Sequence, residues 1–470
     1  MKRILFILLV SFFCLSVDSQ IKIYSVPDGV AHNNDFEVKV RVPGESWNDL
    51  FEYNAEVDMH KVRNTSMVNF DFEGTVELAV KYNCETIKSA RIRPYSLGIT
   101  PVVKGDSVFF KLTKPCNLSL EINGDIFQNL QVFTNSLETY QPNPKDKNVI
   151  YIAPGFHTYP EGKLKIPSGK TLYLAGGAVV KADLVCDNVK NVKVCGRGII
   201  YQPDNGLRIT FSGNVEIDDL IFINSTHYTV FGGQSSGIVV KNIRSFSSKG
   251  WSDGIDMMSC KDVLVDGVFM RNSDDCIALY GHRWDYYGDC RNVLVKNSTL
   301  WADVAHPIMI GTHGNPEKPE VIENVTFTNI DILNEDEPQQ NYQGCMAINV
   351  SDENLARKIL FDNIRIDDIE QGQLVNLRVT YNKKYATAPG RGIEDIRFKD
   401  ISYNGKNAGT SILEGYSSDR CIKNIVFENL TINGVLIHDK MKKPGYYQTT
   451  DLAKFYTGVY VEGLQFISTK

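Results

Sequence analysis

The sequence predicts an all-β protein in which an N-terminal β-sandwich precedes a parallel β-helix. Short stretches in which apolar and polar residues alternate, without helical periodicity, fill residues 20–141. After them a short strand motif recurs at intervals of 23 to 37 residues through most of the chain. A tandem repeat of this length, built from strands and turns, is the sequence signature of a solenoid.

Residues 1–19 are predicted to be a secretory signal peptide. Two basic residues open the chain, a long apolar run follows, and small residues end it. Bulky Phe13 stands directly before Cys14, where lipid attachment would require small residues, so a soluble exported protein is favoured over a lipoprotein. No later stretch reaches the ~18 apolar residues of a membrane span. We therefore expect a protein exported to the periplasm, the cell surface or the medium.

Residues 20–141 are predicted to form the sandwich domain. Alternating stretches such as "FEVKVRV", "VELAVKY" and "NLSLEIN" are separated by turn signals such as Asn123-Gly124. This number of short strands is typical of a sandwich. The segment "QPNPKDKN" at 141–148, with its two prolines, is predicted to be the linker, and the β-helix domain is assigned to 148–470.

Each copy of the repeat begins with a residue that suits a tight bend and continues as an apolar-alternating strand. Asparagine at such a bend can also form side-chain ladders between successive turns. The copies begin at Asn191, Asn214, Gly237, Asp262, Asn292, Asn324, Lys358, Asp395, Asn424 and Gly458.

Composition limits the partners. The formal net charge of −6 argues against nucleic acid and against an anionic membrane surface. Nine cysteines follow the predicted signal peptide and none forms a CxxC pair, so buried free thiols are expected rather than a zinc site or a disulfide framework. We expect a monomer without a metal or other cofactor.

Polar residues head a second strand in consecutive turns. This strand reads "HYTVFG" at His227, "DGIDMM" at Asp253, "DCIALY" at Asp275 and "HPIMIG" at His306, with Asp274 one residue before Asp275. Equivalent positions in neighbouring turns lie about 4.8 Å apart. The alignment therefore predicts a cluster of three carboxylates and one or two imidazoles on one face of the β-helix.

Such a cluster suits acid–base cleavage of a glycosidic bond. One carboxylic acid protonates the leaving oxygen, and a second carboxylate attacks the sugar or activates water, the latter at a separation of ~6.5–9.5 Å. Like charges at close range raise the pKa of one acid, which then keeps its proton near neutral pH. A single pair of aspartates is more often a solvated turn, but its place in a polar column favours a catalytic site.

Three segments of this column resemble the active-site motifs of glycoside hydrolase family 28, the polygalacturonases. They are "SDGIDM", "NSDDCIAL" and "AHPIMIGTHG". The resemblance implies a right-handed, pectin-lyase-like β-helix and an inverting hydrolase. It further implies that Asp274 is the general acid, that Asp253 and Asp275 hold and activate the water, and that His306 belongs to the catalytic set.

The related family 49 of dextranases and isopullulanases shares this fold and the three acids. The N-terminal sandwich resembles the dextranase architecture. The Arg-Ile-Lys motif with which polygalacturonases grip a carboxylate is absent. The segment "NLRVTYNKK" offers Arg378 with Lys383 or Lys384 instead, later in the chain and at a different spacing. The substrate can therefore be galacturonan or a neutral glycan.

Further residues near the column are candidates for binding substrate. Aromatic rings can stack on sugar faces, and imidazole or guanidinium groups can bind a hydroxyl or a carboxylate. For each, packing within the fold is the competing interpretation. The candidates are His227, His282, Arg283, Trp284, His313 and Arg378.

Two other functions remain open at this point. A β-helical polysaccharide lyase would use a lysine or arginine base, often with calcium, but no basic residue stands beside the acids in the column. A non-catalytic glycan-binding β-helix would have no need of stacked acids.

Overall fold

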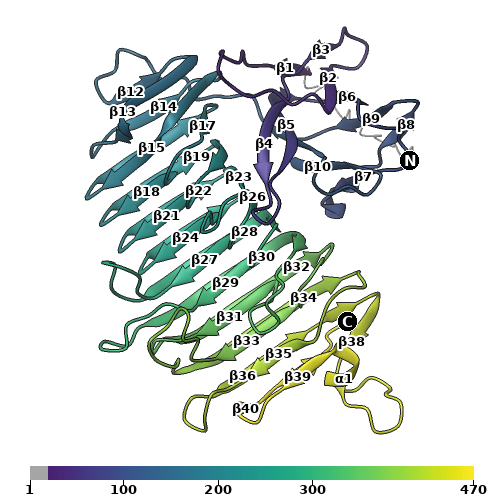
Figure 1. Cartoon of the computed structure of the whole chain (residues 1–470), viewed down its shortest axis with the longest axis vertical. Helices are drawn as coiled ribbons and strands as arrows, with labels where there is room; N and C mark the ends of the chain where they lie inside the picture. The colour runs from purple at the N-terminus through teal and green to yellow at the C-terminus, as the bar shows by residue number, and fades with distance from the viewer. Residues whose placement is uncertain (1–18) are drawn as a thin grey trace, which may run out of the picture.

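The computed structural model describes residues 19–470 and contains a sandwich docked beside the N-terminal half of a long β-helix (Figure 1). The predicted signal peptide, apart from Ser19, lies outside the described residues. Within residues 19–470, no helix has the length and apolar character needed to cross a membrane.

Two sheets enclose one apolar core in the N-terminal region. Strands such as Phe36–Arg41 and Val76–Tyr82 alternate buried and exposed side chains, because successive residues of a strand point to opposite faces. One sheet contains β1 (Gln20–Lys22), β4 (Tyr53–Val57), β5 (Arg63–Glu73), β7 (Ala90–Arg93), β10 (Asn117–Ile122) and β11 (Leu130–Asn135). The other contains β2 (Phe36–Arg41), β3 (Asn48–Asp49), β6 (Val76–Tyr82), β8 (Val102–Lys104) and β9 (Ser107–Leu112), and the 3₁₀ turn η1 covers Tyr95–Leu97.

From Val149 onward the strands stack in parallel, turn upon turn, around a continuous apolar interior. This is the predicted right-handed parallel β-helix, and its strands form three rows. The stacking starts with β12 (Val149–Ile152) and β13 (Gly155–Lys165), which pair in parallel with β14 (Thr171–Leu174) and β15 (Ala178–Asp187) of the next turn.

The first row carries the repeated motif. It contains β14 (Thr171–Leu174), β16 (Lys190–Gly196), β19 (Gly213–Asp218), β22 (Ser236–Lys241), β25 (Lys261–Asp266), β36 (Ile422–Glu428), β40 (Val461–Glu462) and β41 (Gln465–Ile467). The second row faces the sandwich and contains β17 (Ile199–Tyr201), β20 (Ile221–Ser225), β23 (Arg244–Ser247), β26 (Phe269–Asn272) and β37 (Leu430–Ile432). Four long strands run through both rows: β28 (Cys290–Ala302), β30 (Val321–Glu335), β32 (Leu355–Ile366) and β34 (Gly392–Tyr403).

The third row carries the polar column. It contains β18 (Leu207–Thr210), β21 (Val230–Gly233), β24 (Ile255–Met258), β27 (Ile277–Tyr280), β29 (Ile308–Gly311), β31 (Met346–Val350), β33 (Val375–Val379), β35 (Ser411–Glu414) and β39 (Phe455–Thr457). The hairpin strand β38 (Val435–Ile437) and the short helix α1 (Thr449–Ala453) lie near the C-terminus.

The repeat follows the predicted register until its last copy. Nine of the ten predicted starting residues have positive φ angles, as the tight bend requires. The tenth, Gly458, is wrong, because Val426 pairs with Gln465, and this places Gly463, at φ 70°, opposite Asn424. An insertion before the final strand displaces the motif by five residues. All nine cysteines of the described chain are free, and seven of them are buried.

Candidate active site

The third row aligns the acids as the sequence predicts, with one correction. Ile255, Ile277 and Ile308 pair in successive turns, so Asp253, Asp275 and His306, each two residues earlier, occupy one column. The preceding turn is shifted by one residue, because Val230 pairs with Ile255. Tyr228 therefore stands in the column where His227 was predicted.

The acids line a cavity of about 350 Å³ on the outside of the third row. The cavity is surrounded by turns of the β-helix, by loops near residues 337–342 and 384–385, and by the tip of the β4–β5 hairpin. Its lining includes Met59, His60, Tyr228, Trp251, Asp253, Asp274, Asp275, Tyr280, Arg283, His313, Glu337, Tyr342, Lys384 and Tyr385.

The three carboxylates converge closely. One carboxylate oxygen from each of Asp253, Asp274 and Asp275 lies within 4.8 Å of the other two. Asp253 and Asp275 are buried, whereas Asp274 is half-buried and has more access to solvent. Three oxygens at this spacing could also hold one hard cation geometrically, so the functional test below includes a chelator.

Asp274 is held at the rim by the backbone. Trp251 N–H donates to its Oδ2 at 2.9 Å, and the N–H of Asp275 donates to its Oδ1 at 3.2 Å. Burial, reinforced by the charge of Asp275, raises the pKa of Asp274 to about 7. Asp274 can therefore carry a proton near neutral pH and release it in the same range, as a general acid must.

Asp253 is a buried acid of the cluster. Its Oδ1 has no hydrogen-bond partner within the described chain. Burial and the charges of Asp256, Asp274 and Asp275 raise its pKa well above the ordinary value for aspartate. A proton shared among these carboxylates relieves their repulsion.

Asp275 is paired with His306. The Nδ1 atom of His306 lies 2.6 Å from Oδ1 of Asp275, and Tyr280 donates its hydroxyl to Oδ2 at 3.3 Å. Burial lowers the pKa of His306, but the charge and hydrogen bond of Asp275, with the charge of Glu335, outweigh it and raise the pKa to about 9. The imidazole of His306 therefore carries a positive charge beside Asp275 at neutral pH.

His306 lies behind Asp275 rather than at the cavity surface. It is fully buried, its Nε2 bonds to the carbonyl of Tyr342, and it is not among the residues that line the cavity. The sequence places it in the catalytic set, whereas this geometry makes it a positioning residue that orients Asp275.

The predicted binding residues separate into two groups. Arg283 and His313 line the cavity, and the ring of His313 packs edge-on against Tyr280 at a centroid distance of 5.0 Å. Burial and the charge of Arg283 lower the pKa of His313 to about 3, so this imidazole is neutral. Neutral His313 can accept or donate a hydrogen bond to a sugar hydroxyl.

The other four predicted binding residues lie outside the cavity lining. The Nδ1 atom of His282 bonds to the carbonyl of Tyr286 at 2.6 Å and therefore fixes its own loop. The rings of His227 and Trp284 both pack against Tyr228. Arg378 forms an ion pair with Glu414 at 2.8 Å and lines an adjoining cavity of about 460 Å³, which shares Thr312, Gln339 and Tyr342 with the acid-lined one.

Sequence reasoning missed several residues of the site. Asp256, the second aspartate of the motif "SDGIDM", is fully buried. Neither of its carboxylate oxygens has a hydrogen-bond partner in the described chain. The motif that marks Asp253 also contains Asp256 and could have identified it as a candidate site residue. Met59 and His60 come from a distant segment, and nothing in their local sequence marks them. Lys384, which also lines the cavity, belongs to the segment "NLRVTYNKK", which the sequence does offer for binding a carboxylate.

A known protein family matches most of the β-helix. The sequence model of "Glycosyl hydrolases family 28" matches residues 185–449, more than half of the chain. A polygalacturonase of Juniperus ashei is 24% identical over 259 residues, covering 51% of this chain and 46% of that protein. Exopolygalacturonase B of Aspergillus niger is 25% identical over 253 residues, covering 50% of this chain and 53% of that protein. The chain thus spans about half the length of the curated relatives it matches.

Solved structures share the fold at low sequence identity. Dex49A from Penicillium minioluteum superposes with a TM-score of 0.57 at 12% identity, over 95% of this chain and 96% of that one. The family 28 exopolygalacturonase of Yersinia enterocolitica gives a TM-score of 0.51 at 11% identity, over 83% and 96%. On the extent of the sequence match, the chain belongs to glycosyl hydrolases family 28.

Proposed function

We propose that this protein is an exported, inverting glycoside hydrolase that cleaves O-glycosidic bonds of a polysaccharide. The observation that carries the proposal is the convergence of Asp253, Asp274 and Asp275 within 4.8 Å in one cavity. The predicted signal peptide supports export, and family membership supports the reaction class.

In this mechanism Asp274 is the general acid. It is the most accessible of the three, and its pKa of about 7 keeps a proton available for the leaving glycosidic oxygen. Asp275, paired with the His306 imidazolium, accepts a proton from the attacking water. Asp253 holds that water together with Asp275.

The carboxylate spacing bears on the stereochemistry. Inverting pairs usually lie ~6.5–9.5 Å apart and retaining pairs ~5–5.5 Å apart, so the closest oxygens here are nearer the retaining spacing. Two hydrogen bonds of ~2.7 Å span at most ~5.4 Å, so a water molecule can bridge two carboxylate oxygens that lie within 4.8 Å of each other. Inversion is therefore proposed from the motif resemblance and from this bridging water.

The substrate class is tested on both uronate and neutral polymers. Arg283 and Lys384 line the cavity and could attract a carboxylate, and the curated relatives named above are polygalacturonases. Arg378, by contrast, is engaged by Glu414 and is a poor free carboxylate clamp. A panel of pectic polymers, dextran and other plant glycans, assayed for released reducing ends, decides between them.

Proton NMR of the first-formed anomer tests the mechanism. Inversion of configuration is expected, and retention would contradict the bridging-water mechanism. Absence of any reducing end across the panel would instead support a non-catalytic glycan-binding protein.

A second candidate function is a polysaccharide lyase, because the basic residue Arg283 lies in the same cavity as the acids. Burial disfavours the charge of Arg283, but the nearby tyrosines and acids outweigh it and raise its pKa, so Arg283 is a poor base. A lyase would release an unsaturated product that absorbs in the ultraviolet, often with calcium. Activity that survives EDTA without such a product excludes it.

A further inference from the structure

The β4–β5 hairpin of the sandwich is anchored on the second row of the β-helix. Its apolar side chains join those of the second row in one core cluster, which includes Tyr53, Ala55, Val57, Met67, Phe246, Phe269 and Trp301. The backbone N–H of Glu56 donates to Oδ1 of Asn224 at 2.7 Å, and Ser248 donates to the Glu56 carboxylate at 3.2 Å. Apolar packing and hydrogen bonds thus both fix the hairpin to the β-helix.

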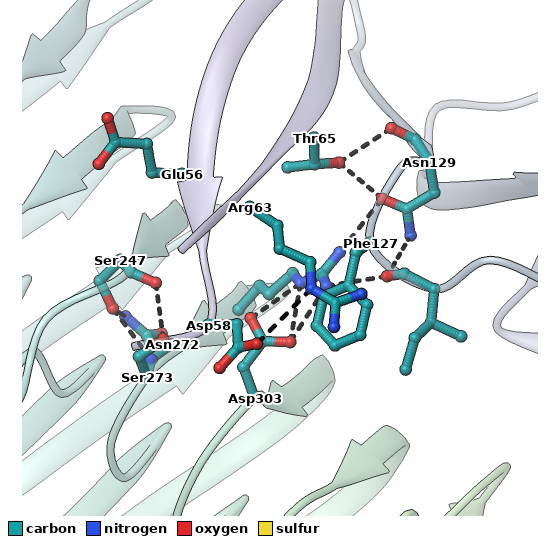
Figure 2. A network of polar contacts seen from close by, with 12 residues as sticks. Glu56, Asp58, Arg63, Thr65, Phe127, Asn129, Ser247, Asn272, Ser273 and Asp303 are labelled. Atoms are coloured by element: carbon teal, nitrogen blue, oxygen red, sulfur yellow. Dashed lines mark hydrogen bonds and ion pairs between the residues drawn. The ribbon is translucent and has the colours of Figure 1, made fainter. Parts of the chain in front are cut away.

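Polar contacts hold the tip of the hairpin beside the acid motif. Asp58, with φ 62°, accepts the N–H of His60 at 2.9 Å and closes the turn. Figure 2 shows Asp58 and Arg63 next to Asp303 of the β-helix. Asp303 in turn forms a buried ion pair at 3.0 Å with Arg271, three residues before Asp274.

Beyond these anchors the tip extends into the acid-lined cavity. Met59 and His60 are both part of the cavity lining. Met59 is half-buried yet outside the apolar cluster that docks the hairpin, and His60 is exposed. A Cβ atom placed on Gly250 would lie 3.8 Å from the sulfur of Met59, so Met59 covers the turn in which Trp251 binds Asp274.

We propose that Met59 and His60 form a wall of the substrate cleft that contacts a saccharide unit beside the bond to be cleaved. This inference rests on the proposed function. The thioether of Met59 packs on the apolar C–H face of a sugar ring, and the His60 imidazole bonds to a hydroxyl or carboxylate. The sandwich thereby contributes to substrate binding and not only to folding.

A wall that touches substrate away from the reacting atoms changes binding more than chemistry. We expect Met59→Ala/His60→Ala to raise KM about tenfold, the effect of losing a well-packed contact, with the larger part of the loss in KM rather than kcat. Lys61→Ala/Val62→Ala is the matched control, because both residues are exposed in the same tip and neither lines the acid-lined cavity.

Binding is measured independently of turnover in the Asp274→Asn background. Titration calorimetry with tetragalacturonate and with isomaltotetraose gives Kd for this parent, for the Met59/His60 variant and for the control. A Kd about tenfold weaker in the Met59/His60 variant alone supports the wall. If the Met59/His60 variant and the control both bind with the same Kd as the parent, the proposed wall is refuted. If the double variant does not fold, His60→Ala at its exposed position provides the same comparison.

The outcomes separate the inference from the function on which it rests. If the parent binds an oligosaccharide but the wild type hydrolyses nothing, the proposed hydrolase is refuted, and the Kd comparison still decides the wall. If the parent binds neither tetrasaccharide and the wild type releases no sugar, both proposals fail.

Discussion

Asp274 and Asp275 are adjacent in sequence but have different surroundings. Asp275 belongs to the column of Asp253 and is buried against His306. Asp274 precedes the column by one residue, reaches the cavity rim and accepts two backbone N–H groups. Since neighbouring residues of a chain project in different directions, one acid can pair with a base while the other carries a proton.

Replacing Asp274 by Asn should abolish turnover and stabilise the fold above neutral pH. The folded-state pKa of about 7 exceeds the unfolded value of ~3.9, so the wild type loses stability as pH rises through this interval. Asn carries no charge and escapes this loss. We expect a gain of about 1–3 kcal/mol at pH 8 that disappears near pH 4, measured by thermal unfolding.

Asp285→Asn is the matched control, since Asp285 is an exposed acid of the neighbouring loop. It should leave both activity and the pH dependence of unfolding unchanged. A folded, active Asp274→Asn enzyme would refute the role of Asp274 as general acid.

The activity of the wild type should fall at alkaline pH. The competent form of Asp274 is protonated, and its pKa of about 7 means that this form is depleted as pH rises above 7. We expect log kcat to decline by about one unit per pH unit beyond that point. A kcat that stays constant up to pH 9, with the fold intact by circular dichroism, would contradict the assignment.

At the scale of elements, the bends of the β-helix are fixed by asparagine ladders. Asn329 has φ 55°, donates to Oδ1 of Asn297 at 2.8 Å and accepts from Asn363 at 3.3 Å. Asparagine tolerates this conformation better than most residues and also supplies the hydrogen bonds. The ladder therefore helps to keep these successive turns in register.

Asn329→Ala should cost about 1–3 kcal/mol of stability, because it loses the ladder bonds and strains the left-handed bend. Asn329→Gly loses only the bonds and should cost less. The unfolding midpoint should thus be highest for the wild type, lower for Asn329→Gly and lowest for Asn329→Ala. Equal midpoints for the two variants would show that backbone conformation is not what selects asparagine here.

At the scale of the whole molecule, Arg271 joins the two regions. Its guanidinium binds Asp303, donates to the carbonyl of Ile126 at 2.9 Å and packs over Trp301 at 3.9 Å. Ile126 belongs to the N-terminal region, and Arg271 directly precedes the acid motif. Docking of the sandwich and placement of Asp274 therefore depend on the same side chain.

Arg271→Ala should destabilise the protein by about 3–5 kcal/mol, because it leaves Asp303 charged, buried and unpaired. The double variant Arg271→Met/Asp303→Leu removes both charges and should be less destabilised than the single variant. Unfolding midpoints and kcat/KM are measured for both. If the single variant is as stable as the double, the ion pair is not what holds this interface.

The sequence by itself determined the repeat, its spacing and three of the site's acids. Local chemistry explains this success, because bends select residues that tolerate positive φ and buried strands select alternating apolar residues. The one-residue shift that replaces His227 by Tyr228 was not predictable, since hydrogen-bond register between turns decides it. The domain boundaries at 20–141 and 148–470 stay a prediction.

Only the tertiary structure decided which side chains face the cavity. His282, His306 and Arg378 have the chemistry of binding or catalytic groups, but none of them lines the acid-lined cavity: His282 and Arg378 are engaged by partners outside it, and His306 pairs with Asp275 from behind. Met59 and His60 reach that cavity from a hairpin about 200 residues away in sequence, through a docking interface that no local pattern encodes. Sequence patterns record local conformation and burial, whereas a cleft between distant segments exists only once they have packed together.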